Sequence, residues 1–374
     1  MKILHFLDTV NRGGAETLVL DVCRNAEEFG LNISFAHAGG GALEEDFKNS
    51  GVKYFRLNRR LPFDLLLVSS LRKIINDNKI NIIHTHQAVE ALHALAAAFG
   101  TKTQVVLTHH GIIPDRKNLL ATRFLITRVA HNILVGRESK KNYEREFNFT
   151  FPSQTSVIYN GVDEQRLQPG KADFRTELNL SNDDFLIGMI GNFYAEPRKD
   201  QATLCRALPQ ILNQLSNVHC IFAGKTFSGG QERFDECVKI CAENGTSEKV
   251  QFLGGRSDVP DILHALDVCV SSSLAEGLPI AVNEAMLAGV PTILSNIAPL
   301  LEASNDGEFA EIFTVENESE LSEKVLKLLA NRDLRKDLAI RAKQFAKENF
   351  SIEAHLDKLH KLYERLERGH SCPQ

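Results

Sequence analysis

The chain has 374 residues, of which 43% are hydrophobic and 24% are charged, and its formal net charge is −5. This composition is ordinary for a globular protein. It excludes a membrane-spanning chain, because no apolar run approaches the roughly 18–20 residues that a spanning helix needs. The length predicts two domains.

The charge is distributed unevenly along the chain. Residues 1–165 contain 20 Lys and Arg against 17 Asp and Glu, whereas the remainder is acidic. A basic first half suits a lipid-linked acceptor, although a chance asymmetry of solvated faces explains it equally well. The start, Met1–Asp8, is too short before its Asp for a signal peptide. Seven cysteines without a Cys-x-x-Cys pair predict reduced, buried thiols and a cytoplasmic protein.

Short apolar strands alternate with helical segments, such as Ala15–Glu28, through the first half of the chain. This rhythm is typical of parallel sheets with helices on both faces. The predicted strands are Lys2–Leu7, Asn32–Ala36, Val52–Leu57, Ile80–His84, Gln104–Thr108, Asn132–Val135 and Thr155–Ile158.

A glycine pair, Gly13-Gly14, follows the first strand and opens the first helix. Glycines let a ligand approach the backbone closely, but a tight turn alone would also use them. No third glycine follows at the spacing of a G-x-G-x-x-G motif, which disfavours a dinucleotide-binding domain.

Two segments combine basic and apolar residues. Arg56, Arg59, Arg60, Arg72 and Lys73 flank Leu65–Val68, and Arg116, Lys117, Arg123 and Arg128 alternate with Leu119, Leu120, Phe124 and Leu125. Such segments can lie on an anionic membrane, which would place the protein peripherally at the inner face of the cytoplasmic membrane. Ordinary helices whose cations extend into solvent explain the pattern equally well, and both interpretations stay open.

Two neighbouring strands end in histidines. His84 and His86 close the fourth strand, and His109 and His110 close the fifth. Four histidines at adjacent strand ends could suggest a metal hydrolase, but the sequence offers no convincing carboxylate partner. The alternatives are polar edges of a cleft without a special role and an imidazole that lines an active site.

A turn signal, Asn160-Gly161, precedes the polar stretch Asp163–Asp184, which contains Pro169 and Gly170. We expect the junction between two domains here, with the first domain covering residues 1–163 and the second covering 164–349.

The alternation of strands and helices continues in the second half, so we expect two tandem, doubly wound, Rossmann-like α/β domains. Helical spacing covers Glu320–Leu329 and continues to about Glu367, with a break at Phe350-Ser351-Ile352. The predicted strands are Phe185–Ile190, Val218–Ala223, Val250–Leu253, Val268–Ser271, Val290–Leu294 and Glu311–Val315.

Two loops of the second half carry cations. Arg198 and Lys199 follow the strand Phe185–Ile190, where a solvated pair is the alternative to an anion site. Gly224-Lys225-Thr226 is similar to the end of a P-loop, but the first glycine of that motif would fall on His219 inside an apolar strand. An ATPase is therefore rejected.

Two glutamates eight positions apart straddle the start of a helix. Glu276 follows the strand Val268–Ser271, the segment Gly277-Leu278-Pro279-Ile280 leads into the helix, and Glu284 lies about one turn into it. Ligands of open α/β sheets bind at this edge, and the amides of a helix start favour an anion. Two carboxylates beside an anion site suit an anion that also carries hydroxyl groups. Solvated surface charges are the alternative.

The segment Glu276–Glu284, followed by Ala285-Met286 and Gly289-Val290-Pro291, resembles the E-x7-E signature of retaining GT-B-fold glycosyltransferases. The resemblance is to family four in particular, of the bacterial polysaccharide and lipopolysaccharide type, and it extends from Gly13 to Tyr363. It implies two domains facing a cleft, with a helix at about 350–367 crossing back onto the first, acceptor-binding domain. It also implies transfer of a sugar from a nucleoside diphosphate sugar, with a UDP-sugar favoured, to a hydroxyl of a glycan or glycolipid.

The resemblance assigns roles to several residues. In that family the first glutamate contacts the donor sugar and the second contacts the ribose, which implies these roles for Glu276 and Glu284. Gly13 and Gly14 match a glycine loop near the donor phosphate. His110 matches the histidine of a strand-end Thr-x-His-Gly, which lies near the transferred sugar, and Lys225 lies where the family approaches the base.

The diphosphate-binding loop departs from the family pattern. The family has an Arg after the glycine at position 191 and a Lys five residues later, whereas this chain has Asn192 and then Lys199 seven residues later. The resemblance therefore implies that Arg198 compensates, and that Lys199, Arg198 and the amides of Gly277–Ile280 stabilise the leaving diphosphate.

Two other functions stay open. The same fold hosts sugar-nucleotide 2-epimerases, and a non-catalytic nucleotide-sugar-binding subunit is a further alternative, against which the presence of both glutamates and His110 argues. We expect no metal and no other cofactor, because the sequence lacks an Asp-x-Asp pair for a metal-diphosphate site. No nucleic-acid partner is expected.

Overall fold

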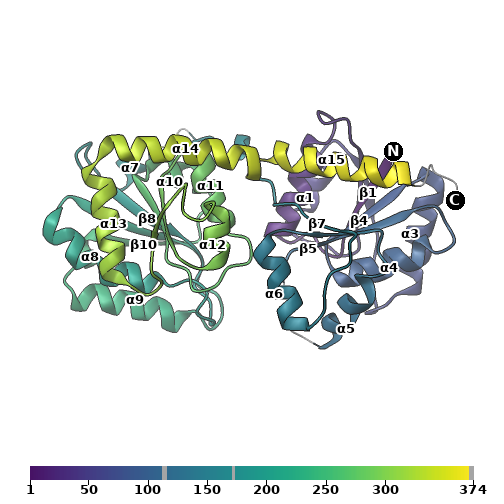
Figure 1. The fold of residues 1–374 in the computed structure, drawn as a ribbon, viewed down its shortest axis with the longest axis horizontal. Coiled ribbons are helices and arrows are strands. Elements are labelled where there is room, and N and C mark those ends of the chain that lie inside the picture. Colours follow the sequence, from purple (N-terminus) through teal and green to yellow (C-terminus); the bar gives the residue numbers. More distant parts are fainter. Residues whose placement is uncertain (112–115, 171–172, 370–374) are drawn as a thin grey trace. The chain divides into compact units, whose positions relative to one another are not determined.

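The computed structural model describes residues 1–111, 116–170 and 173–369, which form two compact units. Unit 1 comprises residues 1–162 together with the segment from Ile352 onward, and unit 2 comprises Asp163–Ser351. Each unit is a parallel β-sheet with helices on both faces (Figure 1). The expected α/β fold with two doubly wound sheets is confirmed.

The sheet of unit 1 has seven strands in the order β3-β2-β1-β4-β5-β6-β7. These strands are β1 (Lys2–Leu7), β2 (Asn32–His37), β3 (Lys53–Arg56), β4 (Ile82–Thr85), β5 (Gln104–His109), β6 (His131–Leu134) and β7 (Thr155–Val157). The helices are α1 (Gly14–Asn25), α2 (Glu44–Lys48), α3 (Leu65–Asn78), α4 (Ala88–Ala98), α5 (Arg116–Leu125), α6 (Arg137–Phe147) and α15 (Ile352–Gly369). The strand order changes direction between β1 and β4, where doubly wound sheets open a binding crevice.

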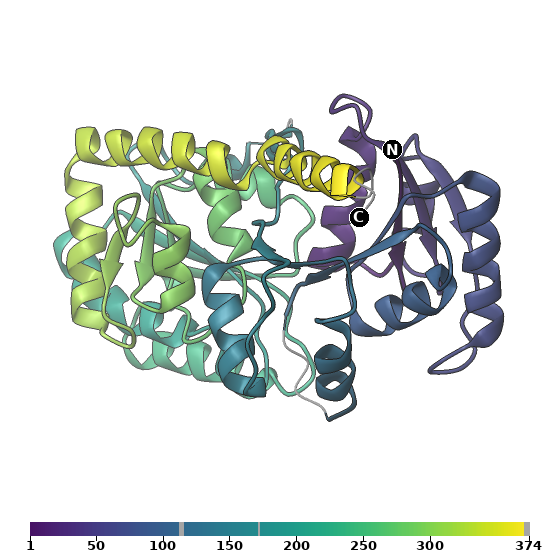
Figure 2. The ribbon, with the colours of Figure 1, turned by 45° about the vertical axis from the view of Figure 1, so that its right-hand side comes forward.

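Unit 1 is held together by two apolar layers, one on each face of its sheet. On one face α15 lies beside α1 (Figure 2), and Leu359 packs with Leu18 and Ile3. On the other face α3 and α4 pack against the strands through residues such as Leu71. Helices cover both faces of the sheet, and β4 is therefore buried at every residue, including the polar His84 and Thr85.

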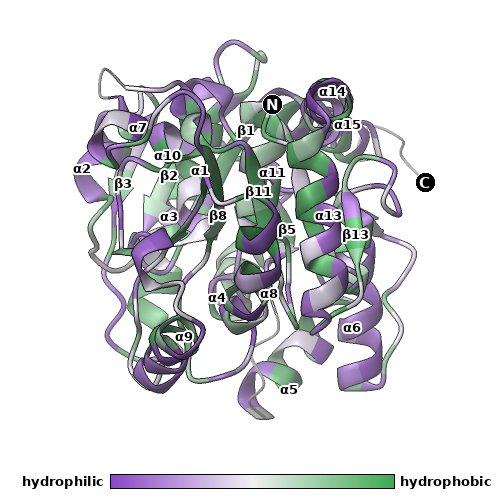
Figure 3. Cartoon of the chain, turned by 90° about the vertical axis from the view of Figure 1, so that its left-hand side faces the viewer, coloured by the Kyte–Doolittle hydropathy of each residue, from purple (hydrophilic) through white to green (hydrophobic). Residues whose placement is uncertain are grey.

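The sheet of unit 2 has six strands in the order β10-β9-β8-β11-β12-β13. These strands are β8 (Phe185–Ile190), β9 (Val218–Ala223), β10 (Val250–Gly254), β11 (Val268–Ser271), β12 (Thr292–Ser295) and β13 (Glu311–Phe313). The α-helices are α7 (Phe174–Glu177), α8 (Gln201–Gln214), α9 (Gln231–Glu243), α10 (Val259–Ala265), α11 (Ile280–Ala288), α12 (Ala298–Ala303), α13 (Glu318–Ala330) and α14 (Arg332–Phe350). Two short 3-10 helices are η1 (Glu164–Leu167) and η2 (Ser247–Lys249). Figure 3 shows hydrophobic residues concentrated on the strands and on α11, whereas α9 is mostly hydrophilic.

The thirteen strands predicted from the sequence are all present, and their ends shift by a few residues. The predicted break in the last helical stretch is also present, because α14 ends at Phe350 and α15 begins at Ile352. Gly289 ends α11 in the left-handed conformation with a φ of 81°, which glycine adopts without a steric cost.

Candidate active site

Two adjacent strand ends of unit 2 carry most of the predicted donor-binding residues. β8 and β11 pair in parallel, so the loop with Arg198 and Lys199 emerges beside the loop with Glu276. The amides of Leu274 and Ala275 donate to the carbonyl of Arg198 at 2.8 and 3.2 Å. The backbone thus fixes the two loops to each other.

Glu276 is held by two partners. Lys199 Nζ forms a short ion pair with Glu276 Oε1, and the Ser273 hydroxyl donates to the same oxygen at 2.6 Å. The side chains of Lys199 and Glu276 are only 15% and 10% exposed. Ser295 in turn donates to the Ser273 carbonyl at 2.6 Å. Charge-assisted hydrogen bonds of this kind fix the carboxylate more firmly than neutral ones.

The helix start after Glu276 offers fewer amides than the sequence suggested. Pro279 has no N–H group and is the N-cap of α11 rather than its first residue. The Ile280 amide donates to the Leu278 carbonyl at 2.9 Å. Within the described chain, the amides of Gly277 and Leu278 therefore remain for a ligand, and a Cβ at Gly277 would meet nothing within 4 Å. Pro279 therefore cannot contribute an amide to the predicted anion site, and the Ile280 amide is bonded to a turn carbonyl in this structure.

Glu284 lies one turn into α11 and is half-buried. The helix places it on the same sheet edge as Glu276, as the spacing predicted. Arg198 is exposed, in contrast to the neighbouring Lys199.

Asn192 joins two loops of this edge. Its Oδ1 accepts from the Lys225 amide at 2.8 Å, and its Nδ2 donates to the Tyr194 hydroxyl at 3.0 Å. The backbones meet closely here, because a Cβ at Gly224 would lie 2.1 Å from the carbonyl oxygen of Gly191. Asn192 thus fixes the loops after β8 and β9.

Lys225 lies at a different part of the same edge. Its side chain covers Gly255, where a Cβ would lie 2.3 Å from Lys225 Cγ. Gly255 follows β10, which two strands separate from β11. Three strand spacings correspond to roughly 14 Å. The cations of unit 2 are therefore spread along the edge rather than clustered.

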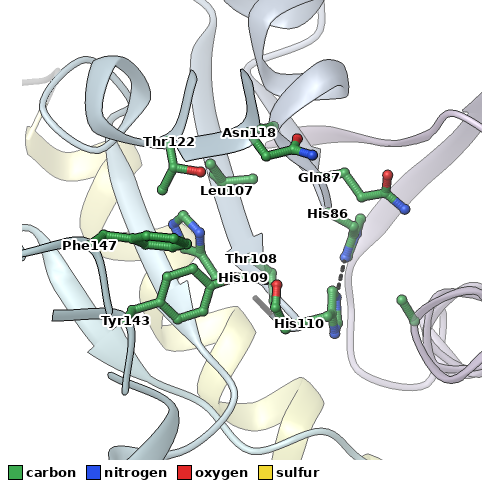
Figure 4. A pocket seen from close by; sticks show the side chains of 13 residues that line it. His86, Gln87, Leu107, Thr108, His109, His110, Asn118, Thr122, Tyr143 and Phe147 are labelled. Atoms are coloured by element: carbon green, nitrogen blue, oxygen red, sulfur yellow. Dashed lines mark hydrogen bonds between the residues drawn. The ribbon is translucent and has the colours of Figure 1, made fainter. Parts of the chain in front are cut away.

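Unit 1 brings the first turn of α1 and His110 to one cavity (Figure 4), whose lining residues do not include Gly13 and Gly14. Gly13 is the N-cap of α1 and Gly14 is its first residue, and Ala15 lines the cavity together with His110. The cavity has a volume of about 280 Å³. The other lining residues are His86, Gln87, Ala88, Leu107, Thr108, His109, Gly111, Asn118, Thr122, Tyr143 and Phe147.

None of the described residues that line this cavity has a side chain that is charged at neutral pH. Burial lowers the pKa of His110 to about 3 and that of His109 to about 4, and it holds the pKa of His86 well below its ordinary value. The imidazoles are therefore neutral. Tyr143 donates to the Gly111 carbonyl, and amides and hydroxyls complete the polar lining. Such a surface suits an uncharged group with several hydroxyls.

Sequence reasoning missed Ser273 and the bridging role of Asn192. Ser273 stands three residues before Glu276, which is the spacing of a local side-chain contact and could have been noticed. The contact between Asn192 and Lys225 joins positions 33 residues apart and has no local signal. Among the described residues, no helix combines the length and the apolar character that crossing a membrane requires.

Comparison with known proteins identifies the family. Residues 12–166 match the model "Glycosyltransferase Family 4", and residues 170–345 match "Glycosyl transferases group 1". The chain is 27% identical over 285 residues, 72% of either chain, to an Escherichia coli UDP-Gal:alpha-D-GlcNAc-diphosphoundecaprenol alpha-1,3-galactosyltransferase. It is 21% identical to the N-acetyl-alpha-D-glucosaminyl L-malate synthase of Bacillus anthracis over 85% of this chain and 83% of that one.

Solved structures agree on the fold. Anabaena HepE in complex with UDP superposes with a TM-score of 0.83 at 21% identity, covering 98% of this chain and 100% of that one. A glycosyltransferase from Rickettsia africae also reaches 0.83, at 16% identity and 98% coverage of both chains. The two family models, which together cover most of the sequence, show that the chain belongs to the family 4 glycosyltransferases and is itself a glycosyltransferase.

Proposed function

We propose that the enzyme transfers a sugar from a UDP-sugar to a hydroxyl of a glycan or glycolipid, with retention of the anomeric configuration, in the synthesis of cell-surface polysaccharide or glycolipid. The observation that carries this proposal is the fixed carboxylate Glu276 beside Lys199 at the carboxyl ends of β8 and β11. The names of the relatives support the donor class, because the Escherichia coli enzyme is named for UDP-galactose and HepE was solved with UDP.

Lys199 and Glu276 can exchange partners when a donor binds. In the structure Lys199 neutralises Glu276, and both are largely buried. A diphosphate offers Lys199 a stronger anionic partner, and the sugar hydroxyls can then donate to Glu276. Leaving-group charge would be met by Lys199, by exposed Arg198 and by the amides of Gly277 and Leu278.

The spread of polar groups along the edge suits an extended nucleotide. Glu284 on α11 would bind the ribose hydroxyls. Lys225 follows β9, two strand spacings or roughly 10 Å from β11, and its side chain, which extends over Gly255 after β10, would lie toward the base. In unit 1, Gly13 and Gly14 let a phosphate approach the backbone, and neutral His110 would bond a sugar hydroxyl without adding charge.

A thermal-shift panel of UDP-, GDP- and ADP-sugars tests the donor. A ligand that binds only the folded state raises its apparent stability, so a UDP-sugar should give the largest rise in Tm. Glu284→Gln should abolish that rise, whereas Glu323→Gln, an exposed glutamate of the same unit, should leave it unchanged. If every nucleotide sugar raised the Tm equally, and the rise were still present in Glu284→Gln, the assignment of a UDP-sugar donor and of Glu284 to its binding would be contradicted.

Proton NMR of the early product tests both the reaction and its stereochemistry. Retention predicts the donor's anomeric coupling in a new glycoside. An inverted coupling would overturn retention, and conversion of the UDP-sugar without an acceptor would identify an epimerase instead.

We further propose that transfer requires no metal and no other cofactor, since Arg198, Lys199 and backbone amides can take over the neutralisation of the diphosphate. Activity should then persist in excess chelator. A complete loss that Mg²⁺ or Mn²⁺ restores would contradict this proposal.

A membrane contact through unit 1 is also part of the proposal. The loop into α3 exposes Leu61 (59%), Phe63 (46%) and Leu65 (72%), and Arg60 beside them is exposed as well. On α5, Leu120 and Phe124 are exposed, and the guanidinium of Arg128 stacks 3.9 Å from the Phe124 ring centre. Exposed apolar residues next to cations suit an anionic lipid surface, where a glycolipid acceptor would reside.

Sedimentation with vesicles tests this contact. The protein should bind phosphatidylglycerol vesicles more strongly than phosphatidylcholine vesicles. Leu65→Ser combined with Leu66→Ser should weaken binding, whereas Ile340→Ser, equally exposed at 71% but in unit 2, should not. Equal binding by all variants would rule out this surface.

A further inference from the structure

A line of hydrogen-bonding side chains runs from His110 into the core of unit 1. His110 Nε2 lies 3.0 Å from His86 Nδ1 (Figure 4), and His86 Nε2 lies 3.2 Å from His5 Nδ1. His5 Nε2 then lies 3.3 Å from the hydroxyl of Tyr363 on α15. The line thereby connects β1, the ends of β4 and β5, and the last helix.

The line continues beyond Tyr363. Its hydroxyl lies 2.5 Å from His84 Nδ1, and His84 Nε2 lies 2.7 Å from the Thr108 hydroxyl. We call the six residues His110, His86, His5, Tyr363, His84 and Thr108 the imidazole chain. Both of its ends, His110 and Thr108, line the cavity of unit 1.

The imidazoles of this chain are neutral in the folded protein. Burial lowers the pKa of His5 to about 3, and burial with the neighbouring His5 holds the pKa of His84 well below its ordinary value. A neutral imidazole has one N–H donor and one acceptor nitrogen. Every hydrogen bond of the imidazole chain must therefore be donated in the same direction. Moving the proton of a single ring to its other nitrogen would place two donors, or two acceptors, opposite each other.

The end of the chain at His110 sets that direction. His110 Nδ1 is buried without a hydrogen-bond partner among the described residues, and a buried N–H group without a partner is rarer than a bare acceptor. His110 therefore carries its proton on Nε2 and donates to His86, so that Tyr363 donates to His84 Nδ1. It follows that His84, His5, His86 and His110 all carry their proton on Nε2, and that His84 donates to Thr108.

This direction leaves one atom without a partner. His110 Nδ1 is buried and has no hydrogen-bond partner among the described residues, and in this arrangement it is a bare acceptor. We propose that His86, His5, Tyr363 and His84 are positioning residues that hold His110 in the Nε2–H tautomer, so that Nδ1 accepts a hydrogen bond from a hydroxyl group of the bound sugar. The role in transfer rests on the proposed function, whereas the tautomers do not depend on it.

A metal ion is the competing explanation for the central histidines. One ring nitrogen from each of His5, His84 and His86 lies within 4.8 Å of the others. However, all six ring nitrogens of these residues already face a hydrogen-bond partner.

The wild-type protein alone permits a first test. Long-range ¹H–¹⁵N correlation spectra of ¹⁵N-histidine-labelled protein report which ring nitrogen carries the proton. The expected result is the Nε2–H tautomer for His5, His84, His86 and His110. An Nδ1–H tautomer at His110, or one equivalent of zinc in the purified protein bound through His5, would overturn the proposal.

Tyr363→Phe provides the second test. Without the hydroxyl, an Nε2–H of His5 would face a ring that cannot accept it, and a buried donor without a partner is costly. His5 should move its proton to Nδ1, and His86 and His110 should follow. Thr108→Val removes the acceptor at the far end of the imidazole chain and should likewise move the ring protons of its histidines from Nε2 to Nδ1. With this second variant, the test remains possible if Tyr363→Phe does not fold.

Tyr54→Phe is the matched control. Tyr54 also bonds a histidine of unit 1, His37, but it lies outside the imidazole chain. Its removal should leave the His110 tautomer unchanged. With the UDP-sugar that gives the largest thermal shift, Tyr363→Phe should lower kcat/KM roughly tenfold, as loss of one hydrogen bond implies. An unchanged tautomer, or a switched tautomer with unchanged kinetics, would overturn the role of the chain.

Discussion

Glu276 and Lys199 depend on each other, because each is the charged partner of the other in a largely buried place. Removing one side chain leaves a buried charge on the other without a partner. A lower activity of such a variant could then come from lost stability as well as from lost function. Substitutions that keep the shape and the contact with Ser273 are therefore the informative ones.

Glu276→Gln should lower kcat/KM for transfer at least roughly tenfold, since it removes a charge-assisted hydrogen bond to the sugar. The amide oxygen can still accept from Ser273, so the loop should stay in place. Steady-state kinetics check the loss, with Glu323→Gln as the control. A wild-type rate would remove Glu276 from the site.

The loop after β8 gives a second residue-scale prediction. Lys199→Gln, which keeps a polar side chain of similar length beside Glu276, and Arg198→Ala should each lower kcat/KM for the donor by about tenfold, because the leaving diphosphate develops charge that these cations meet. Asn192→Ala should have a smaller effect, through the loop contact with Lys225. Kinetics at fixed ionic strength compare the three variants. If Asn192→Ala is the most damaging, Arg198 is a solvated surface cation and the proposed alignment fails.

Local spacing predicted which residues of the site would lie on one edge, but not what they touch. Glu276 and Glu284 straddle a helix start, and that placement follows from the chain alone. The partners Lys199 and Glu276 are 77 residues apart, and their contact requires that β8 and β11 be neighbours. The loss of the Ile280 amide to a turn likewise depends on the loop conformation.

At the scale of elements, strands were easier to predict than helix ends. A parallel strand buried on both faces is usually a short, mostly apolar run, and β11 is an example that is buried at every residue. Helix ends depend on single capping contacts. The first helix was expected at Ala15–Glu28 and instead spans Gly14–Asn25, because the chain turns before Gly30, which has a φ of 65°.

The last helix, α15, gives an element-scale prediction. Leu359 is fully buried between α15 and the sheet of unit 1. Leu359→Ala should therefore lower the free energy of unfolding by about 2–5 kcal/mol. Urea denaturation measures the change, with Ile340→Ala on the exposed face of α14 as the control, for which at most about 0.5 kcal/mol is expected. Equal effects would mean that α15 adds little to unit 1.

At the scale of the whole molecule, the two units differ in their buried histidines. Burial lowers the pKa of His5 and His110 to about 3 and that of His109 and His355 to about 4, and all four belong to unit 1. The unfolded chain takes up protons near the ordinary value of 6.5. The unfolded state therefore binds more protons below that pH, and unit 1 loses stability as the pH falls.

Between pH 7 and pH 5, one group shifted from 6.5 to about 3 costs about 2 kcal/mol. Urea unfolding followed by tyrosine circular dichroism reports mainly on unit 1, which holds Tyr54, Tyr143, Tyr159 and Tyr363, and the protein has no Trp. The urea midpoint should fall clearly at pH 5.

Two variants check the cause of this pH dependence. His109→Gln removes one buried imidazole and should flatten it, while His360→Gln on the surface of α15 should not. A midpoint that is the same at pH 7 and pH 5 would contradict the prediction.

Because α15 belongs to unit 1 but follows unit 2 in sequence, synthesis on the ribosome finishes the two units in reverse order. Residues 163–351 emerge as one contiguous segment and can fold as soon as they are free. Residues 1–162 must wait, with the apolar surface that Leu359 and Tyr363 will cover still open to solvent. The earlier-made half of the protein is thus the one most exposed to aggregation and most dependent on chaperones during translation.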